Sequence, residues 1–149
     1  MGIQDRINDA QLLWEHEHHE GALLNVLVAV AASARKQYPK LKDRESFVAF
    51  LEPEIVKISR ISMAGIAFRD KMWTPAELFY KWFRCQLVHE GELPIDAQFV
   101  DKGSALFVQA GGDPGPPLQI SYAWFWVLVR AVTEATINKE LFEPPKAGA

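Results

Sequence analysis

An arginine and a histidine lie five residues apart in an apolar, aromatic stretch, at Arg84 and His89. A neutral imidazole can take a proton from a ribose hydroxyl, and an imidazolium can give one to the departing oxygen. A guanidinium supplies permanently charged donors to a phosphate whose negative charge is redistributing. The pair therefore fits RNA cleavage through the 2′-hydroxyl, with His89 handling protons, Arg84 stabilising the phosphate, and no cofactor or metal.

The spacing limits how this pair could work. On an ideal helix, residues five apart are separated by about 140° around the axis and about 7.5 Å along it, so they do not share a face. Either the last turn is distorted, or the same helix from two subunits of a homodimer meets so that both pairs line one groove. The structural alternative is an arginine that pairs with a carboxylate or extends its head group to solvent.

Two neighbours bear on the same site. Lys81 lies one turn before Arg84 and is a candidate RNA-binding residue, although it could equally pair with Glu77, four residues earlier. Cys85 is the only cysteine, which excludes an intramolecular disulfide and fits a reducing compartment. We expect a packed, inert thiol there, because no cysteine-hydrolase signature surrounds it.

The stretch from Tyr80 to Gly91 resembles the signature of the HEPN superfamily, an Arg-x(4–6)-His motif at the end of an aromatic helix. The layout is also similar: a long first helix ending in SARKQYP, a second helix, the motif helix and an apolar last helix. The resemblance implies a metal-independent endoribonuclease with Arg84 and His89 at a homodimer interface. It also implies a toxin–antitoxin or defence role, with an antitoxin protein as a partner.

The chain departs from that family directly after the arginine. The position is commonly polar, often asparagine, and is Cys85 here. The exchange removes a hydrogen-bonding side chain near the phosphate. The alternative function is therefore a catalytically inactive HEPN-like domain that binds a nucleotide, RNA or a protein partner.

A second polar cluster, the segment WEHEHHE, precedes the longest apolar run. Glu15 and His19 are four residues apart and share a helix face, as do His16 and Glu20, which is the spacing of a metal pair. A metal-dependent enzyme using His16, His18 and His19 is thus a further alternative. The segment has neither an HExxH pattern nor an obvious third ligand, so we favour a solvated polar segment and predict no metal site.

Helical periodicity dominates the first half of the chain. From Gln4 to Tyr38 there is no proline, and apolar residues recur at helical spacing, which predicts one long helix or two with a bend at Gly21. Asp43 is expected to cap a second helix, which Pro53 breaks or restarts.

The motif helix has the clearest boundaries. Further helical turns are expected over residues 55–66, and then Thr74 and Glu77 form a capping box around a proline at the first helical position. This predicts a helix over residues 75–90, which ends at Gly91 in the left-handed conformation.

The second half contains the predicted strands. A strand at residues 105–109 is expected to pair with residues 118–120 as a hairpin, followed by a last helix over residues 121–141. The chain is predicted to be mainly α, a single-domain bundle of four to five helices with a small β-hairpin insert before the last helix. The domain covers residues 1–142, and residues 143–149 form a flexible tail.

Composition limits the function classes. The 149 residues, 49% of them hydrophobic, suffice for one domain with a substantial core. A formal net charge of −3 argues against binding long nucleic acid through an overall positive field, although a local basic pocket is compatible with it. The apolar runs are too short to span a bilayer and the N-terminus lacks a secretory signal. We therefore expect a cytoplasmic protein without a membrane partner.

Overall fold

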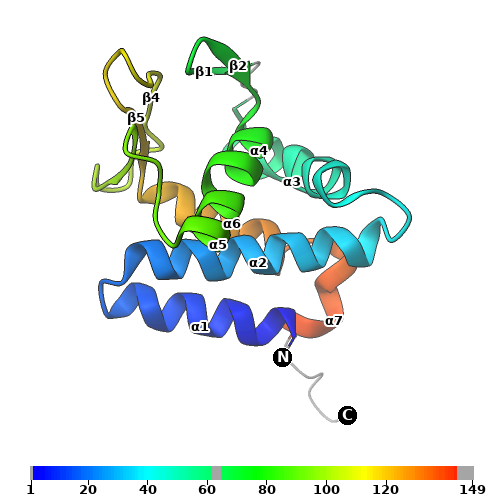
Figure 1. Ribbon diagram of the computed structural model, residues 1–149. Helices are drawn as coiled ribbons and strands as arrows, with labels where there is room; N and C mark the ends of the chain where they lie inside the picture. Colours follow the sequence, from blue (N-terminus) through cyan, green and yellow to red (C-terminus); the bar gives the residue numbers. More distant parts are fainter. Residues whose placement is uncertain (1, 62–64, 144–149) are drawn as a thin grey trace.

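The computed structural model describes residues 2–61 and 65–143, which form a mainly helical domain with two small sheets (Figure 1). This confirms the predicted fold class. The helices are α1 (Ile3–Glu15), α2 (His19–Gln37), α3 (Asp43–Ser59), α4 (Pro75–Leu78), the π-helix η1 (Phe79–Cys85), α5 (Gln86–Glu90), α6 (Ala123–Thr133), the 3-10 helix η2 (Thr136–Asn138) and α7 (Lys139–Phe142). The strands are β1 (Ile66–Phe68), β2 (Lys71–Trp73), β3 (Ala97–Val100), β4 (Val108–Gln109) and β5 (Leu118–Ser121).

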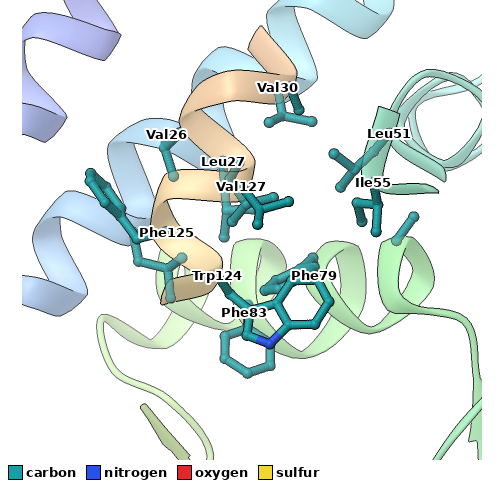
Figure 2. Packing of buried hydrophobic residues seen from close by; sticks show 14 of the residues in the cluster. Val26, Leu27, Val30, Leu51, Ile55, Phe79, Phe83, Trp124, Phe125 and Val127 are labelled. Atoms are coloured by element: carbon teal, nitrogen blue, oxygen red, sulfur yellow. The ribbon is translucent and has the colours of Figure 1, made fainter. Parts of the chain in front are cut away.

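Helix α2 is the centre of the fold. It lies antiparallel to α1 and also packs against α3, α6 and the motif helix (Figure 1). The core between these helices combines aliphatic and aromatic side chains, and within it Trp124 of α6 lies 5.8 Å, between ring centroids, from Phe79 of the motif helix (Figure 2). Burial of these apolar side chains supplies the main driving force for folding.

The break between α1 and α2 falls at residues 16–18, so the predicted bend at Gly21 is wrong. Glu17 adopts a left-handed conformation with φ 62°. Its N–H donates to the Trp14 carbonyl at 3.0 Å, and the His18 N–H donates to the Leu13 carbonyl at 2.9 Å. These two bonds form a Schellman motif, which satisfies the last carbonyls of α1 without the glycine that usually occupies this position.

Helix α3 begins and continues differently from the expectation. Its N-cap is Lys42, and Asp43 is the first helical residue. The predicted break at Pro53 is wrong, since the helix runs through it to Ser59. Phe50 and Ile55, one on each side of the proline, are buried, and their burial offsets the roughly 3 kcal/mol that an internal proline costs.

The helical turns predicted as far as Ile66 are wrong at that end, because β1 and β2 form an antiparallel hairpin there. Residues 62–64 of that prediction lie outside the described residues. Arg69 and Asp70 connect the strands with φ values of 52° and 60°. Positive φ at both central residues is the requirement of a type I′ turn, whose twist matches that of the strands.

The predicted hairpin exists in a shorter form within a three-stranded sheet. Strand β4 pairs antiparallel with β5, and β3, which the sequence pattern did not reveal, pairs parallel with the other edge of β5. Asp96 connects this sheet to the β1–β2 turn, because its carboxylate accepts two hydrogen bonds from the Arg69 guanidinium, both 2.7 Å long. Asp96 is 6% exposed.

The last helix is interrupted where the pattern predicted one helix over residues 121–141. Helix α6 ends at Thr133, and the chain turns before η2 and α7. The buried Asn138 amide donates to the Val132 carbonyl at 3.0 Å and to Ser33 Oγ at 2.8 Å, which ties this turn to α2. The predicted tail lies outside the described residues apart from Glu143. Within the described ranges, no helix has both the length and the apolarity needed to cross a membrane.

Candidate functional site

The motif helix has the predicted ends and an unpredicted middle. Thr74 Oγ1 accepts from the Glu77 N–H and the Glu77 side chain accepts from the Thr74 N–H, which confirms the capping box. Gly91 ends the helix with φ 76°. The seven residues Phe79–Cys85 are π-helical. A π-turn holds one residue more than an α-turn, and such turns occur frequently at functional sites.

Arg84 is held inside its own chain. Its Nη1 donates to Asp43 Oδ2 at 3.0 Å, and its side chain is 20% exposed. The same carboxylate accepts from the Tyr80 hydroxyl at 3.0 Å and from Arg35 Nη1 at 3.3 Å. Burial, followed by the hydrogen bond to Asp43, raises the pKa of Tyr80 to about 12. We call Arg35, Asp43, Tyr80 and Arg84 the Asp43 network; it joins the end of α2, the start of α3 and the motif helix.

His89 is exposed in the last turn of α5. Beyond it the chain turns back to the first turn of α2, where the Leu93 N–H donates to Glu20 Oε1 at 3.4 Å. Among the described residues, no hydrogen bond or ion pair joins His89 to Arg84. Their convergence on one phosphate, within one chain or across a homodimer, therefore stays a prediction.

The two neighbours of the motif have partners of their own. Lys81 Nζ lies 5.3 Å from the ring centres of both Trp73 and Trp82. The alternative pairing with Glu77 is wrong, because Glu77 forms its ion pair with Arg44 at 3.0 Å. Cys85 is a free, half-buried thiol with its sulfur 3.9 Å from Arg84 Nη1. RNA binding by Lys81 stays a prediction.

The histidine segment forms the turn between α1 and α2. His16 and His18 are exposed cap residues, while His19 turns inward. The His19 ring lies 4.4 Å from Trp14 and 4.3 Å from Tyr122, between centroids. No group of three or more His, Cys, Asp or Glu side chains within residues 2–61 and 65–143 is arranged to hold a metal ion.

His19 instead belongs to a concave site that the sequence analysis missed. We call this hollow of about 690 Å³ the aromatic cleft; its walls include Trp14, His19, Tyr122 and Trp126. Trp14 stacks on Phe125 with 4.3 Å between centroids and an angle of 6°. Trp126 lies 6.0 Å from Trp14 and is 44% exposed. Such a volume is within the range of ligand-binding pockets in proteins.

Carboxylates surround the cleft. Glu17 and Asp101 line it, and Glu20 lines an adjoining hollow of about 370 Å³ that shares Glu17, His19 and Tyr122. Burial, followed by the negative charges of Asp101, Glu20 and Glu17, raises the pKa of Tyr122. The cleft therefore has a negative potential at its tyrosine.

Arg130 is the basic side chain in the cleft wall, and its charge is already matched. Its Nη2 donates to Glu134 Oε1 at 3.2 Å, and its Nε donates to the other carboxylate oxygen. This bidentate pair leaves Glu17 and Asp101 as the charges without a basic partner in the cleft wall.

A signal for the cleft was present in the sequence, but its parts were far apart. Trp14 and Trp126 are separated by more than a hundred residues, and the WFW segment of α6 carries aromatic side chains around most of the helix. Trp124 and Phe125 are buried, and the third ring, Trp126, is the one left at the surface.

Comparison with known proteins identifies the family of the chain. The model of the Rv1289 family matches residues 2–144, so the chain belongs to this family. No curated protein and no solved structure matches the chain.

Proposed function

We propose that this member of the Rv1289 family is a binding domain that takes a small ligand into the aromatic cleft. The observation that carries the proposal is the combination of concavity and exposed aromatic surface at one place. Ligand sites are typically hollows lined by aromatic side chains with a few polar groups, and the cleft has this composition, with Tyr122, His19 and two carboxylates among its walls.

The turn at the edge of the cleft positions one of its carboxylates. Glu17 lines the cleft from the left-handed position of the Schellman motif that ends α1, and the two hydrogen bonds of that motif hold its backbone there. The Asp43 network is a weaker candidate site, since its guanidinium and carboxylate already bond each other.

Thermal unfolding of the whole chain against a panel of small amines, nucleosides and carboxylates tests the proposal. A ligand at one hundred times its dissociation constant stabilises the folded state by about 2.7 kcal/mol, which appears as a rise in Tm. Trp126→Ala should abolish this rise, whereas substitution of Met72, a large apolar residue on β2 that is also exposed, by Ala should leave it unchanged. A rise that survives Trp126→Ala would contradict the proposal.

A second candidate function is the HEPN-like metal-independent endoribonuclease, acting as a homodimer on RNA and controlled by an antitoxin protein. The π-helical turn favours it, because the distortion ends at Cys85, directly after Arg84. His89 is exposed and so accessible to a second chain and to RNA. In this function, Arg84 would stabilise the phosphate, His89 would transfer protons, and Lys81 would contact the backbone.

A mixed RNA substrate separates this function from binding alone. The parent chain should cleave it in the presence of a chelator, and His89→Ala should remove cleavage without loss of stability, because the imidazole is exposed. Arg84→Ala should also remove cleavage, with some loss of stability from the Asp43 network. Absence of cleavage by the parent, or cleavage by both variants at the rate of the parent, would exclude the nuclease.

A further inference from the structure

We infer that the ligand of the aromatic cleft is an organic cation, an alkylammonium or quaternary ammonium group attached to a small apolar body. The inference rests on the proposed function, because it names the ligand class of the same cleft. Two independent features of the cleft carry it: exposed aromatic surface in its wall, and carboxylates that have no basic partner there.

The rings provide the first feature. One face of Trp14 is covered by Phe125, and the indole of Trp126, which is 44% exposed, lies beside Trp14 in the wall of the hollow. Tyr122 stands nearly perpendicular to Trp14, at 78° and 5.2 Å between centroids. These two rings contact each other edge to face, so a cation would lie over the exposed surface of the cluster, where a ring face within about 6 Å attracts it through its quadrupole.

The charges provide the second feature. Glu17 and Asp101 lie in the wall, and Glu20 lies in the adjoining hollow. Among the described wall residues Arg130 is the only lysine or arginine, and Glu134 pairs with it. A phosphate or carboxylate ligand would approach these charges with repulsion, whereas a cation gains from them and from the rings together. Asp101 Oδ1 also accepts a hydrogen bond from the Gly103 N–H at 2.9 Å.

The shape of the cleft sets the size of the ligand. A hollow of about 690 Å³ exceeds what a metal ion or a lone ammonium fills, and the described residues around it contain no metal-binding group. An apolar body attached to the cation would cover Leu106 and the Trp126 indole. Burial of the exposed part of Trp126 adds a hydrophobic contribution that inorganic cations lack.

Choline and its neutral isostere 3,3-dimethyl-1-butanol test the charge directly, because they differ mainly in a nitrogen and its charge. Ligand-observed NMR of their methyl signals, titrated with the whole chain, gives both dissociation constants. We expect choline to bind about tenfold or more tightly than the alcohol, in line with cation–π attraction in a partly desolvated site. Equal binding of both would overturn the cation inference and leave the proposed binding function standing.

The double variant Glu17→Gln/Asp101→Asn removes the charge and keeps the side-chain shapes. It should weaken choline binding severalfold and leave the alcohol unchanged. Glu45→Gln/Glu140→Gln is the matched control: it removes the same charge from exposed positions on α3 and α7, away from the turn between α1 and α2 (Figure 1). An equal loss in both double variants would overturn the inference, because only the overall charge would then matter.

Two further outcomes are informative. If a nucleoside or a carboxylate binds through Trp126 and choline does not, the cation inference fails while the cleft remains a binding site. If no ligand of the panel binds and the Trp126 signals change with protein concentration alone, a second copy of the chain covers the cleft. That result would overturn both the inference and the proposed function.

Discussion

The Asp43 network and the aromatic cleft contain the side chains most suggestive of chemistry, and they differ in whether their interactions are complete. In the network, one carboxylate accepts from two guanidinium groups and a phenol. In the cleft, an indole is 44% exposed and two carboxylates line the wall without a basic partner there. The contrast shows that residue type alone does not identify a binding site. Charged groups that pair with one another stabilise the fold, whereas unpaired groups in a hollow remain available to a ligand.

Two tryptophans on one helix give the sharpest test of this contrast. Trp124→Ala should lower the free energy of unfolding by about 3–5 kcal/mol, because the ring is 1% exposed and contacts Phe79 in the core. Trp126→Ala should cost about 1–2 kcal/mol and remove ligand binding. Urea unfolding and the ligand titration measure both quantities. Similar stability losses in the two variants would show that the cleft is part of the core.

The ion pair between Arg69 and Asp96 should affect stability and not ligand binding, because its two charges already satisfy each other. Asp96→Asn should cost about 2–3 kcal/mol, because it leaves Arg69 without its buried partner. Hydrogen bonds from Arg69 are the main cause that lowers the pKa of Asp96, and burial opposes them. The stabilisation is therefore fully present above the ordinary carboxyl value of 3.8 and is lost as the pH falls through the lower folded value.

Urea unfolding of parent and Asp96→Asn from pH 6 to pH 2.5 checks the sign. The difference in free energy of unfolding between the parent and Asp96→Asn should be constant down to about pH 4 and should shrink below it. A difference that grows as the pH falls would contradict the assigned role of Arg69. Choline binding at pH 7 should be the same in both chains, since Asp96 does not line the cleft.

Disruption of the Asp43 network should cost less stability than the Asp96→Asn substitution. Asp43→Ala should cost about 1–2 kcal/mol, because Arg84 is mostly buried but the carboxylate itself is 41% exposed, so solvent weakens the pair. Ligand binding in the cleft should be unchanged. A change in choline affinity would mean that the two regions are coupled and would break the comparison.

The sequence predicts the helical part of the fold well where the signal is local. The capping box at Thr74, the stop at Gly91 and the fold class all follow from neighbouring residues. The pattern fails where distant contacts decide: the π-turn, the helix through Pro53 and the parallel pairing of β3 with β5 depend on packing that no local spacing reveals.

The candidate site residues were likewise predictable from local sequence, but their partners were not. The sequence singles out Arg84 and His89 as a pair and gives the structural alternative of a carboxylate partner, but it does not identify Asp43, which is 41 positions earlier. It also groups His19 with His16 and His18, whereas the fold places His19 against Tyr122. Both partners come from elements brought together only by the tertiary structure.

Loss of the ion pair between Arg130 and Glu134 should have the smallest effect on ligand binding. Glu134→Gln frees the Arg130 guanidinium at the cleft wall, which should weaken choline binding about two- to threefold through repulsion. Stability should not change measurably, because both side chains are largely exposed. The matched control is Glu140→Gln. Tighter choline binding in Glu134→Gln would contradict the charge argument.

The central claim, that the aromatic cleft and not the motif helix receives the ligand, is tested most directly by the indole N–H signals of the five tryptophans. With choline added, the signals of Trp14 and Trp126 should shift, while those of Trp73, Trp82 and Trp124 stay in place. A shift confined to Trp73 and Trp82, which contact Lys81 of the motif helix, or no shift at any indole, would contradict the account.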